Sequence, residues 1–448
     1  MTDLPFGFGH PDRDPERKPG DEGGSAHGAD PFGFGALFGG APGAGTPEEL
    51  LGKMPLFAEL QKLMTWSGGP VNWDLARQGA ISLLATGTQP TSQAEQTAAA
   101  EALRLADLWL DQATELPSGI DRPLAWSRVE WVEQTLPAWR TLIDPLAERV
   151  VGAMTSAIPA DQAAMVGPLA GIMGQMGGFL FGAQVGQALG RLAGEVLTST
   201  DVGLPLAPDG AGVLVPQNVA EFADGLDRPA DEVRLFLALR EAASQRLFAH
   251  VPWLRQQLHE AVHAYARGIT IDREAIERGV SEAMGGMEGG FDPNDPEALQ
   301  RLLPALEPEE TPEQQRALAR LETLLALVEG WVDAVVAAAA ADRLPGLSAL
   351  AETMRRRRAT GGPAEQTFAT LVGLQLRPRR LRDAATVWGA MAAQHGTAAR
   401  DRLWSHPDLL PTSDDLDEPL DFVARQGMDD ELAALTELPN EPEDPDES

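Results

Sequence analysis

Apolar residues recur at intervals of three and four along most of the chain from Thr46 onward. This period places side chains on one face of an α-helix. It predicts helices at 46–63, 73–86, 92–115, 127–136, 139–156, 230–250, 253–267 and 312–341, and a further helical unit at 346–428. The Gly- and Pro-rich stretch 202–228 breaks the pattern and predicts a loop with one or two short strands. We therefore expect a mainly α fold with at most a few short strands.

The segment 163–190 has no charged side chain, and glycine occupies every fourth position from Gly174 to Gly190. Glycines at this spacing line one helical face and let a second helix approach closely. The length would also span a bilayer. However, Pro168 and the Gly177–Gly178 pair interrupt the helical pattern, and no basic cluster flanks the segment. We expect a buried hairpin, with peripheral membrane association as the alternative.

Composition divides the chain into four regions. Residues 1–45 are rich in Gly, Pro and Asp, repeat a Phe-Gly pair and lack the apolar surface needed to fold. Residues 437–448 form an acidic, Pro-rich tail. We expect both ends to be disordered. Between them we expect an N-terminal helical region at 46–200, containing the glycine-lined hairpin, and a helical domain at 201–436.

Net charge and cysteine content limit the classes of binding partner and of catalytic or metal-binding chemistry. The net charge is −32, which argues against binding to nucleic acid or to an anionic membrane. The chain has no cysteine, which excludes disulfides, thiolate metal ligands and a cysteine nucleophile. Acidic residues stand near the N-terminus where a signal peptide would be apolar, so we expect a cytoplasmic protein. The basic run 355–358 lacks interleaved aromatics, and we expect it to pair with acids.

One short motif is typical of a zinc site. His259 and His263 are four residues apart on a predicted helix, so both imidazoles can reach one Zn²⁺. Glu260 lies between them and is placed to accept a proton from a zinc-bound water. Glu282, nineteen residues beyond His263, is the expected third ligand, with Glu329 as the alternative. The same pattern also occurs on ordinary solvated helices, and Arg255 and Arg267 give this helix a polar face.

Four further stretches carry a family resemblance. They are Leu239–Ser244, Leu247–Leu254, Leu327–Asp333 and Gly373–Arg380. Together they resemble the actinobacterial zincin-like family described as zinc-dependent metalloproteases or hydrolases. The resemblance covers most of residues 46–430 and implies a multi-helix zincin-like architecture with a zinc cofactor.

The resemblance places the metal helix of the family one helix before the motif at 259–263. Its two histidines fall on Arg240 and Ser244, and its catalytic glutamate falls on Glu241. The downstream helix of the family supplies Glu329 as a ligand, with Trp331 at a position that is often histidine. Neither Arg240 nor Ser244 can replace a neutral imidazole on zinc. We expect Arg240 to pair with Glu329 or Glu241 and so to supply the missing positive charge.

Two functions stay open at this point. One is a zinc metallopeptidase or hydrolase that uses Glu260, or Glu241 in the inherited site, on a peptide substrate. The other is a non-catalytic zincin-like scaffold that binds a protein partner.

Overall fold

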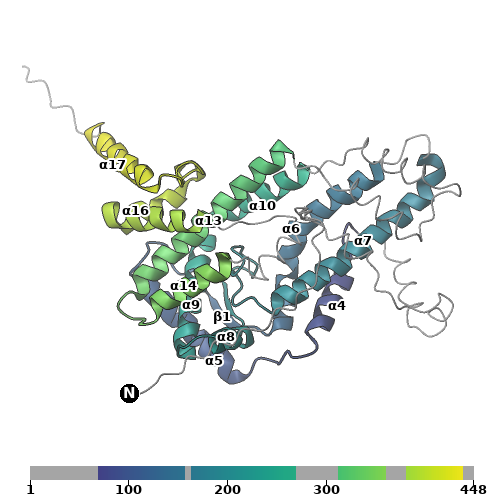
Figure 1. The fold of residues 1–448 in the computed structure, drawn as a ribbon, viewed down its shortest axis with the longest axis horizontal. Helices are drawn as coiled ribbons and strands as arrows, with labels where there is room; N and C mark the ends of the chain where they lie inside the picture. The colour runs from purple at the N-terminus through teal and green to yellow at the C-terminus, as the bar shows by residue number, and fades with distance from the viewer. Residues whose placement is uncertain (1–68, 157–162, 269–310, 360–379, 437–448) are drawn as a thin grey trace, which may run out of the picture.

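The computed structural model describes residues 69–156, 163–268, 311–359 and 380–436. Within these ranges the protein is mainly helical, with one short two-stranded sheet (Figure 1). This confirms the expected fold class. The leader 1–45, the helix expected at 46–63, Glu282 and the acidic tail 437–448 lie outside the described residues.

Two buried helices, α9 (Ala230–His250) and α13 (Pro312–Ala340), pack against each other in the body of the molecule. Almost every side chain of α9 from Phe236 to Phe248 is buried. The neighbours of these helices are α5 (Gln93–Leu110), α10 (Pro252–Arg267), α14 (Leu347–Ala359) and α16 (Leu381–Arg402). The sequence prediction for α9, 230–250, agrees with the structure at both ends.

Helix α13 is long and apolar enough to cross a membrane, the one such helix in the described part of the chain. Its most apolar window is 72% buried inside the protein. A helix that is apolar around its circumference and covered by neighbours is a core helix. Its N-terminus begins with a capping box, in which the Thr311 hydroxyl accepts from the Gln314 backbone N–H.

The glycine-rich segment forms one helix, α7 (Ala163–Ala193), and not the expected hairpin. Helix α4 (Trp73–Leu84) runs along its glycine face, and α6 (Arg128–Ser156) packs beside both (Figure 1). Gly182, Gly186 and Gly190 lie directly against the backbone of α4. The glycines therefore serve close helix packing, and a single helix presents them better than a hairpin would.

Helix α6 also differs from the prediction, because it continues through Pro137 and Pro145 where two helices were expected. An internal proline removes one backbone hydrogen bond. The fully buried Trp131 and Trp139 flank the first proline and pack into the core on both sides of it. Tertiary packing thus holds the helix together across the proline.

The sheet consists of β1 (Arg122–Ala125) and β2 (Ala211–Leu214), paired in parallel with Arg122 opposite Ala211. β2 lies in the segment where short strands were expected. A short helix, α8 (Pro216–Asp224), follows β2 and was not predicted. The sheet contacts α5 and α9, so it forms a small layer beside the central helices.

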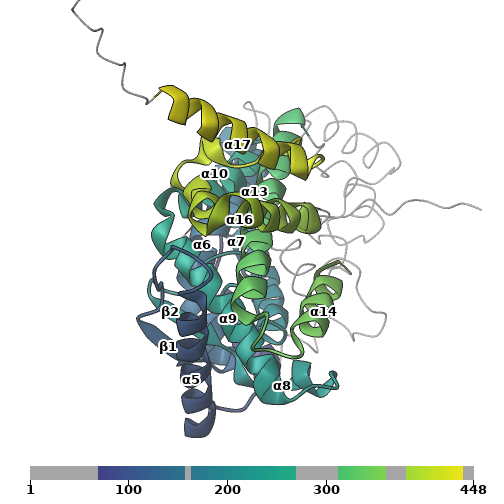
Figure 2. The same cartoon turned by 90° about the vertical axis from the view of Figure 1, so that its left-hand side faces the viewer.

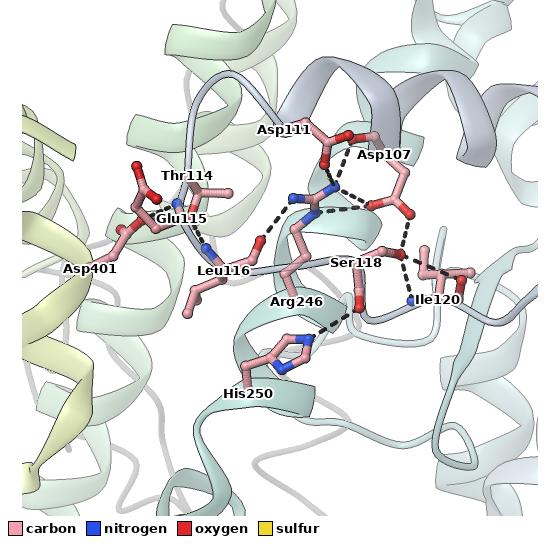
Figure 3. A network of polar contacts seen from close by, with 10 residues as sticks. All are labelled: Asp107, Asp111, Thr114, Glu115, Leu116, Ser118, Ile120, Arg246, His250 and Asp401. Carbon is pink, nitrogen blue, oxygen red and sulfur yellow. Dashed lines mark hydrogen bonds and ion pairs between the residues drawn. The ribbon is translucent and has the colours of Figure 1, made fainter. Parts of the chain in front are cut away.

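A buried arginine fastens the loop between α5 and β1 to α9 (Figure 3). Arg246 Nε and Nη2 donate to Asp107 Oδ1 at 2.9 and 2.7 Å, and Nη1 donates to the Leu116 carbonyl at 2.8 Å. One turn later, His250 Nε2 lies 3.1 Å from the Ser118 carbonyl oxygen. These contacts fix the C-terminal half of α9 relative to α5.

The C-terminal unit continues from α16 through two short 3₁₀ turns, Leu403–Ser405 and Pro407–Leu409, to α17 (Pro419–Thr436). Trp404 stacks between Trp253 and Trp388, with ring centroids 6.1 and 5.2 Å away. This aromatic stack joins the unit to α10, because Trp253 Nε1 also donates to the Trp404 carbonyl at 3.0 Å.

Candidate functional site

The positions onto which the resemblance places the metal helix of the family lie on α9, and two of them border a small polar cavity. Arg240 and Ser244 line it from α9, and Glu329 lines it from α13. The cavity volume is about 10 Å³, which holds one water molecule. The two helices therefore converge on one cavity.

Arg240 occupies this position with its guanidinium between two carboxylates of α13. Its Nη2 donates to Glu329 Oε2 at 2.7 Å, and its Nη1 pairs with Asp333. Glu329 and Asp333 are one helical turn apart, so a single fork-shaped guanidinium reaches both. The side chains of Arg240 and Glu329 are each only 8% exposed. The sequence expectation that Arg240 pairs with Glu329 is confirmed.

A second arginine enters the same cluster from α14. Arg358 forms an ion pair with Glu329, and its Nη2 donates to the Asp201 carbonyl oxygen at 3.4 Å. Burial acts to lower the pKa of Arg358, but the carboxylates of Glu329, Asp201 and Asp333 together outweigh it and raise that pKa above its ordinary value. Glu329 therefore lies between two permanent cations. The sequence analysis predicted acid partners for the run 355–358 but did not identify them.

Glu241 points away from this cluster and is fully buried. Its Oε1 accepts from Ser199 Oγ at 2.5 Å, Gln245 Nε2 at 2.9 Å and Val213 N at 3.1 Å. Its Oε2 accepts from Thr200 Oγ1 at 2.6 Å and Thr200 N at 3.2 Å. A carboxylate offers about four lone-pair directions. Five donors saturate it, so Glu241 has no free lone pair with which to activate a water.

The loop between α7 and β2 contributes a further ion pair, between Asp201 and Arg357. Asp201 Oδ2 accepts from Arg357 Nη1 at 3.1 Å and from the Leu197 backbone N–H at 2.9 Å. Burial alone would raise the pKa of Asp201, but the charges of Arg357 and Arg358 hold it below its usual range. Arg357 Nη2 also donates to the Glu195 carbonyl oxygen at 2.8 Å.

The carboxylate of Glu195 is incompletely hydrogen-bonded. Its Oε2 is buried and has no hydrogen-bond partner among the described residues. Burial raises the pKa of Glu195, with nearby Asp201 adding to the rise and Arg357 opposing it.

The motif at 259–263 lies on α10, one helix later. His259 is half-buried, and burial followed by the charge of Arg255 lowers its pKa. His263 Nε2 is buried without a hydrogen-bond partner in the described part of the protein. Glu260 is exposed, and its Oε1 accepts from Gln256 Nε2 at 2.7 Å.

The described residues hold no group of three His, Cys, Asp or Glu side chains placed to share a metal ion. Glu329, the alternative third ligand, is therefore not brought to His259 and His263, and it is bound by Arg240 and Arg358 instead. Glu282, the expected third ligand, lies outside the described residues.

The inherited position does not fit zinc. A zinc site needs neutral imidazoles or anionic ligands, whereas a guanidinium stays protonated at any ordinary pH. Arg240 is such a cation, and Ser244 Oγ donates to the Arg240 carbonyl at 3.0 Å. Trp331, at the position that is often histidine, donates its Nε1 to Asp401 at 2.9 Å. These three positions therefore make contacts that need no metal.

Comparison with known proteins identifies the family of the chain. Residues 71–423 match the sequence profile of the zincin-like metallopeptidases. The chain belongs to the zincin-like metallopeptidase family. Its fold is similar to that of a Chloroflexus aurantiacus protein described as "a putative hydrolase with a novel fold", with a TM-score of 0.54 and 20% identity. That likeness covers 80% of this chain and 99% of the other. No curated protein matches.

Proposed function

We propose that this zincin-like chain is a non-hydrolytic member of its family, a scaffold in which ion pairs replace the metal of the inherited site. The observation that carries the proposal is Arg240, which places a guanidinium between Glu329 and Asp333. A divalent cation at the same place would face a fixed positive charge within a few ångströms. In a poorly solvated site such repulsion is strong.

The state of Glu241 supports the same conclusion. Hydrolysis by a family member needs a carboxylate that can take a proton from a bound water. Glu241 gives both oxygens to Ser199, Thr200, Val213 and Gln245. These contacts join α9 to β2 and to the loop before it, and they explain why a glutamate stands at this position.

The test is the metal content and peptidase activity of the purified, untagged chain. We expect less than about 0.1 zinc per chain by mass spectrometry after dialysis, and no cleavage of a peptide library above a heat-inactivated control. The matched variant is Arg240→His/Ser244→His, which restores the metal-helix pattern around Glu241. Stoichiometric zinc in the wild type, together with cleavage that a chelator abolishes, would overturn the proposal.

A second candidate function is hydrolysis at His259, Glu260 and His263, with Glu282 as third ligand. Two observations favour it: the lowered pKa of His259 keeps that ring neutral at pH 7, and His263 Nε2 has no partner in the described residues. Neutral imidazoles with a free nitrogen are what zinc requires. His259→Ala/His263→Ala separates the two candidates, because it would abolish zinc binding only if this motif holds the metal.

The setting of this function is also a proposal. A cytoplasmic location agrees with a chain that has no cysteine and in which the one described helix long and apolar enough to cross a membrane is mostly buried. Actinobacterial origin, which the resemblance implies, stays a prediction. A protein partner is the expected ligand of a non-hydrolytic scaffold.

A further inference from the structure

Helix α14 lies on the outer side of the body, next to α9 and α13 (Figure 2). It buries two apolar side chains, Leu350 and Met354. Leu347 and Ala351 also pack against the core while staying partly exposed. The polar anchors of the helix are Arg357, which pairs with Asp201, Arg358, which pairs with Glu329, and the Gly346 backbone N–H, which donates to Glu232 at 2.5 Å. A helix attached in this way depends on its ion pairs more than a core helix does.

The ion pairs of α14 are of one chemical kind. Two consecutive guanidiniums, Arg357 and Arg358, reach two buried carboxylates, Asp201 and Glu329, whose side chains are 6% and 8% exposed. The backbone oxygens of Glu195 and Asp201 accept further N–H groups from the same two arginines. Carboxylates and carbonyl oxygens arranged around a planar fork are the groups that recognise guanidinium.

The same helix closes the inherited cavity. Met354 and Arg358 of α14 form part of its lining. Thr200, Arg240, Ser244 and Glu329 line it from other parts of the protein. Without α14, Glu329 would keep Arg240 but lose its second cation, and Asp201 would lose both of its guanidinium neighbours. A buried carboxylate without a cationic partner is strongly destabilising. The surface exposed by removal of α14 would therefore favour binding of another basic group.

We infer that the surface formed by Asp201, Glu329 and the Glu195 carbonyl is a binding site for a paired-arginine peptide segment, and that α14 occupies it in cis. A partner with two adjacent arginines would compete with Arg357 and Arg358 and displace α14. The lowered pKa of Asp201 agrees with this assignment, because the carboxylate stays charged as a guanidinium ligand requires. The inference concerns the same cavity as the proposed function and holds whether or not zinc binds at His259 and His263.

The arginine run supplies its own control. Arg355 and Arg356 belong to the same helix and carry the same charge, but they are exposed and form ion pairs with Glu352 of α14 itself. Arg357→Gln/Arg358→Gln therefore removes the inserted guanidiniums, and Arg355→Gln/Arg356→Gln makes an equal change of charge on the outer face. Both variants are made in the full-length chain.

Hydrogen exchange measured by mass spectrometry reports release of the helix. In Arg357→Gln/Arg358→Gln we expect the amides of α14 to exchange at least about tenfold faster than in the wild type, since loosely attached elements open locally. In Arg355→Gln/Arg356→Gln they should stay within about twofold of the wild type. Equal exchange in the two variants would overturn the inference. So would loss of the circular-dichroism signal of the folded protein in Arg357→Gln/Arg358→Gln, because a displaceable segment must be separable from the fold.

Binding is tested with a fluorescein-labelled peptide of residues 347–359. It should bind the Arg357→Gln/Arg358→Gln chain at least about tenfold more tightly than the wild-type chain, whose site is filled. A peptide with glutamine in place of the two inner arginines should lose that binding. Equal affinity of the two peptides, or equal affinity for variant and wild type, would show that the surface does not recognise guanidinium.

Discussion

The packing of α4 on α7 makes a sharp prediction, because a Cβ added at one glycine would clash with the backbone of the other helix, whereas a Cβ added at its neighbour in space would not. A Cβ added at Gly186 would lie 2.6 Å from the Ala76 carbonyl oxygen and 3.0 Å from Ala76 Cα. Both atoms belong to the backbone of α4 and cannot rotate away. Gly186→Ala therefore forces the two helices apart.

The size of the effect follows from two opposing terms. Overpacking of a tight contact costs about 1–3 kcal/mol, and a clash against backbone falls in the upper part of that range. Replacing glycine by alanine inside a helix returns about 1 kcal/mol. We expect Gly186→Ala to lower the free energy of unfolding by about 1–2 kcal/mol, the difference between these terms.

Gly79 on α4 is the matched control. A Cβ there meets Gly186 Cα at 3.9 Å, an ordinary van der Waals distance. Gly79→Ala should therefore gain up to about 1 kcal/mol from helix propensity alone. Urea unfolding followed by circular dichroism gives both values. The reasoning fails if Gly186→Ala is as stable as Gly79→Ala, because the glycines would then not set the distance between the helices.

Two other changes test the polar interior. The raised pKa of Glu195 means that the folded protein holds this proton more tightly than the unfolded chain, so Glu195 lowers stability as pH rises through its folded pKa. Glu195→Gln should accordingly raise the unfolding temperature at pH 8 and leave it unchanged near pH 4, about where the unfolded carboxyl is half protonated; an equal shift at both pH values would contradict this. Arg246→Met should cost about 3 kcal/mol, because it removes the fully buried guanidinium that pairs with the partly buried carboxylate of Asp107. The exposed Arg255→Met should cost less than about 1 kcal/mol, and comparable losses in urea unfolding would refute the distinction.

The pairing of Arg240 with Glu329 was predictable from the sequence because the family resemblance assigns both residues to one site. Arg240 stands where a histidine is expected and Glu329 where a ligand is expected, and a cation beside an anion in a buried site forms an ion pair. Helical spacing also places Asp333 one turn from Glu329, on the same face. These relations need only the helical period and the assignment of two helices to one cleft.

The partners from other elements could not be predicted in the same way. Arg358 reaches Glu329 from α14, and Ser199 and Thr200 reach Glu241 from a loop. Neither contact has a periodic signal, since each depends on how separate segments are arranged in space. The continuous helices α6 and α7 escaped prediction for a related reason: Pro137 and the Gly177–Gly178 pair are local interruptions that packing overrides.

Glu241 shows why a retained motif residue is weak evidence for retained chemistry. A glutamate in the metal helix is expected to be a base, and its presence beside Arg240 and Ser244 first indicates a partly preserved active site. The structure gives it a different task, since five donors from the loop before β2, from β2 itself and from α9 surround its two oxygens. Replacing it would leave those donors unsatisfied in the core, which is costly whether or not the protein hydrolyses anything. Glu241 therefore has a structural role that explains its presence, and its presence alone is no evidence of hydrolysis.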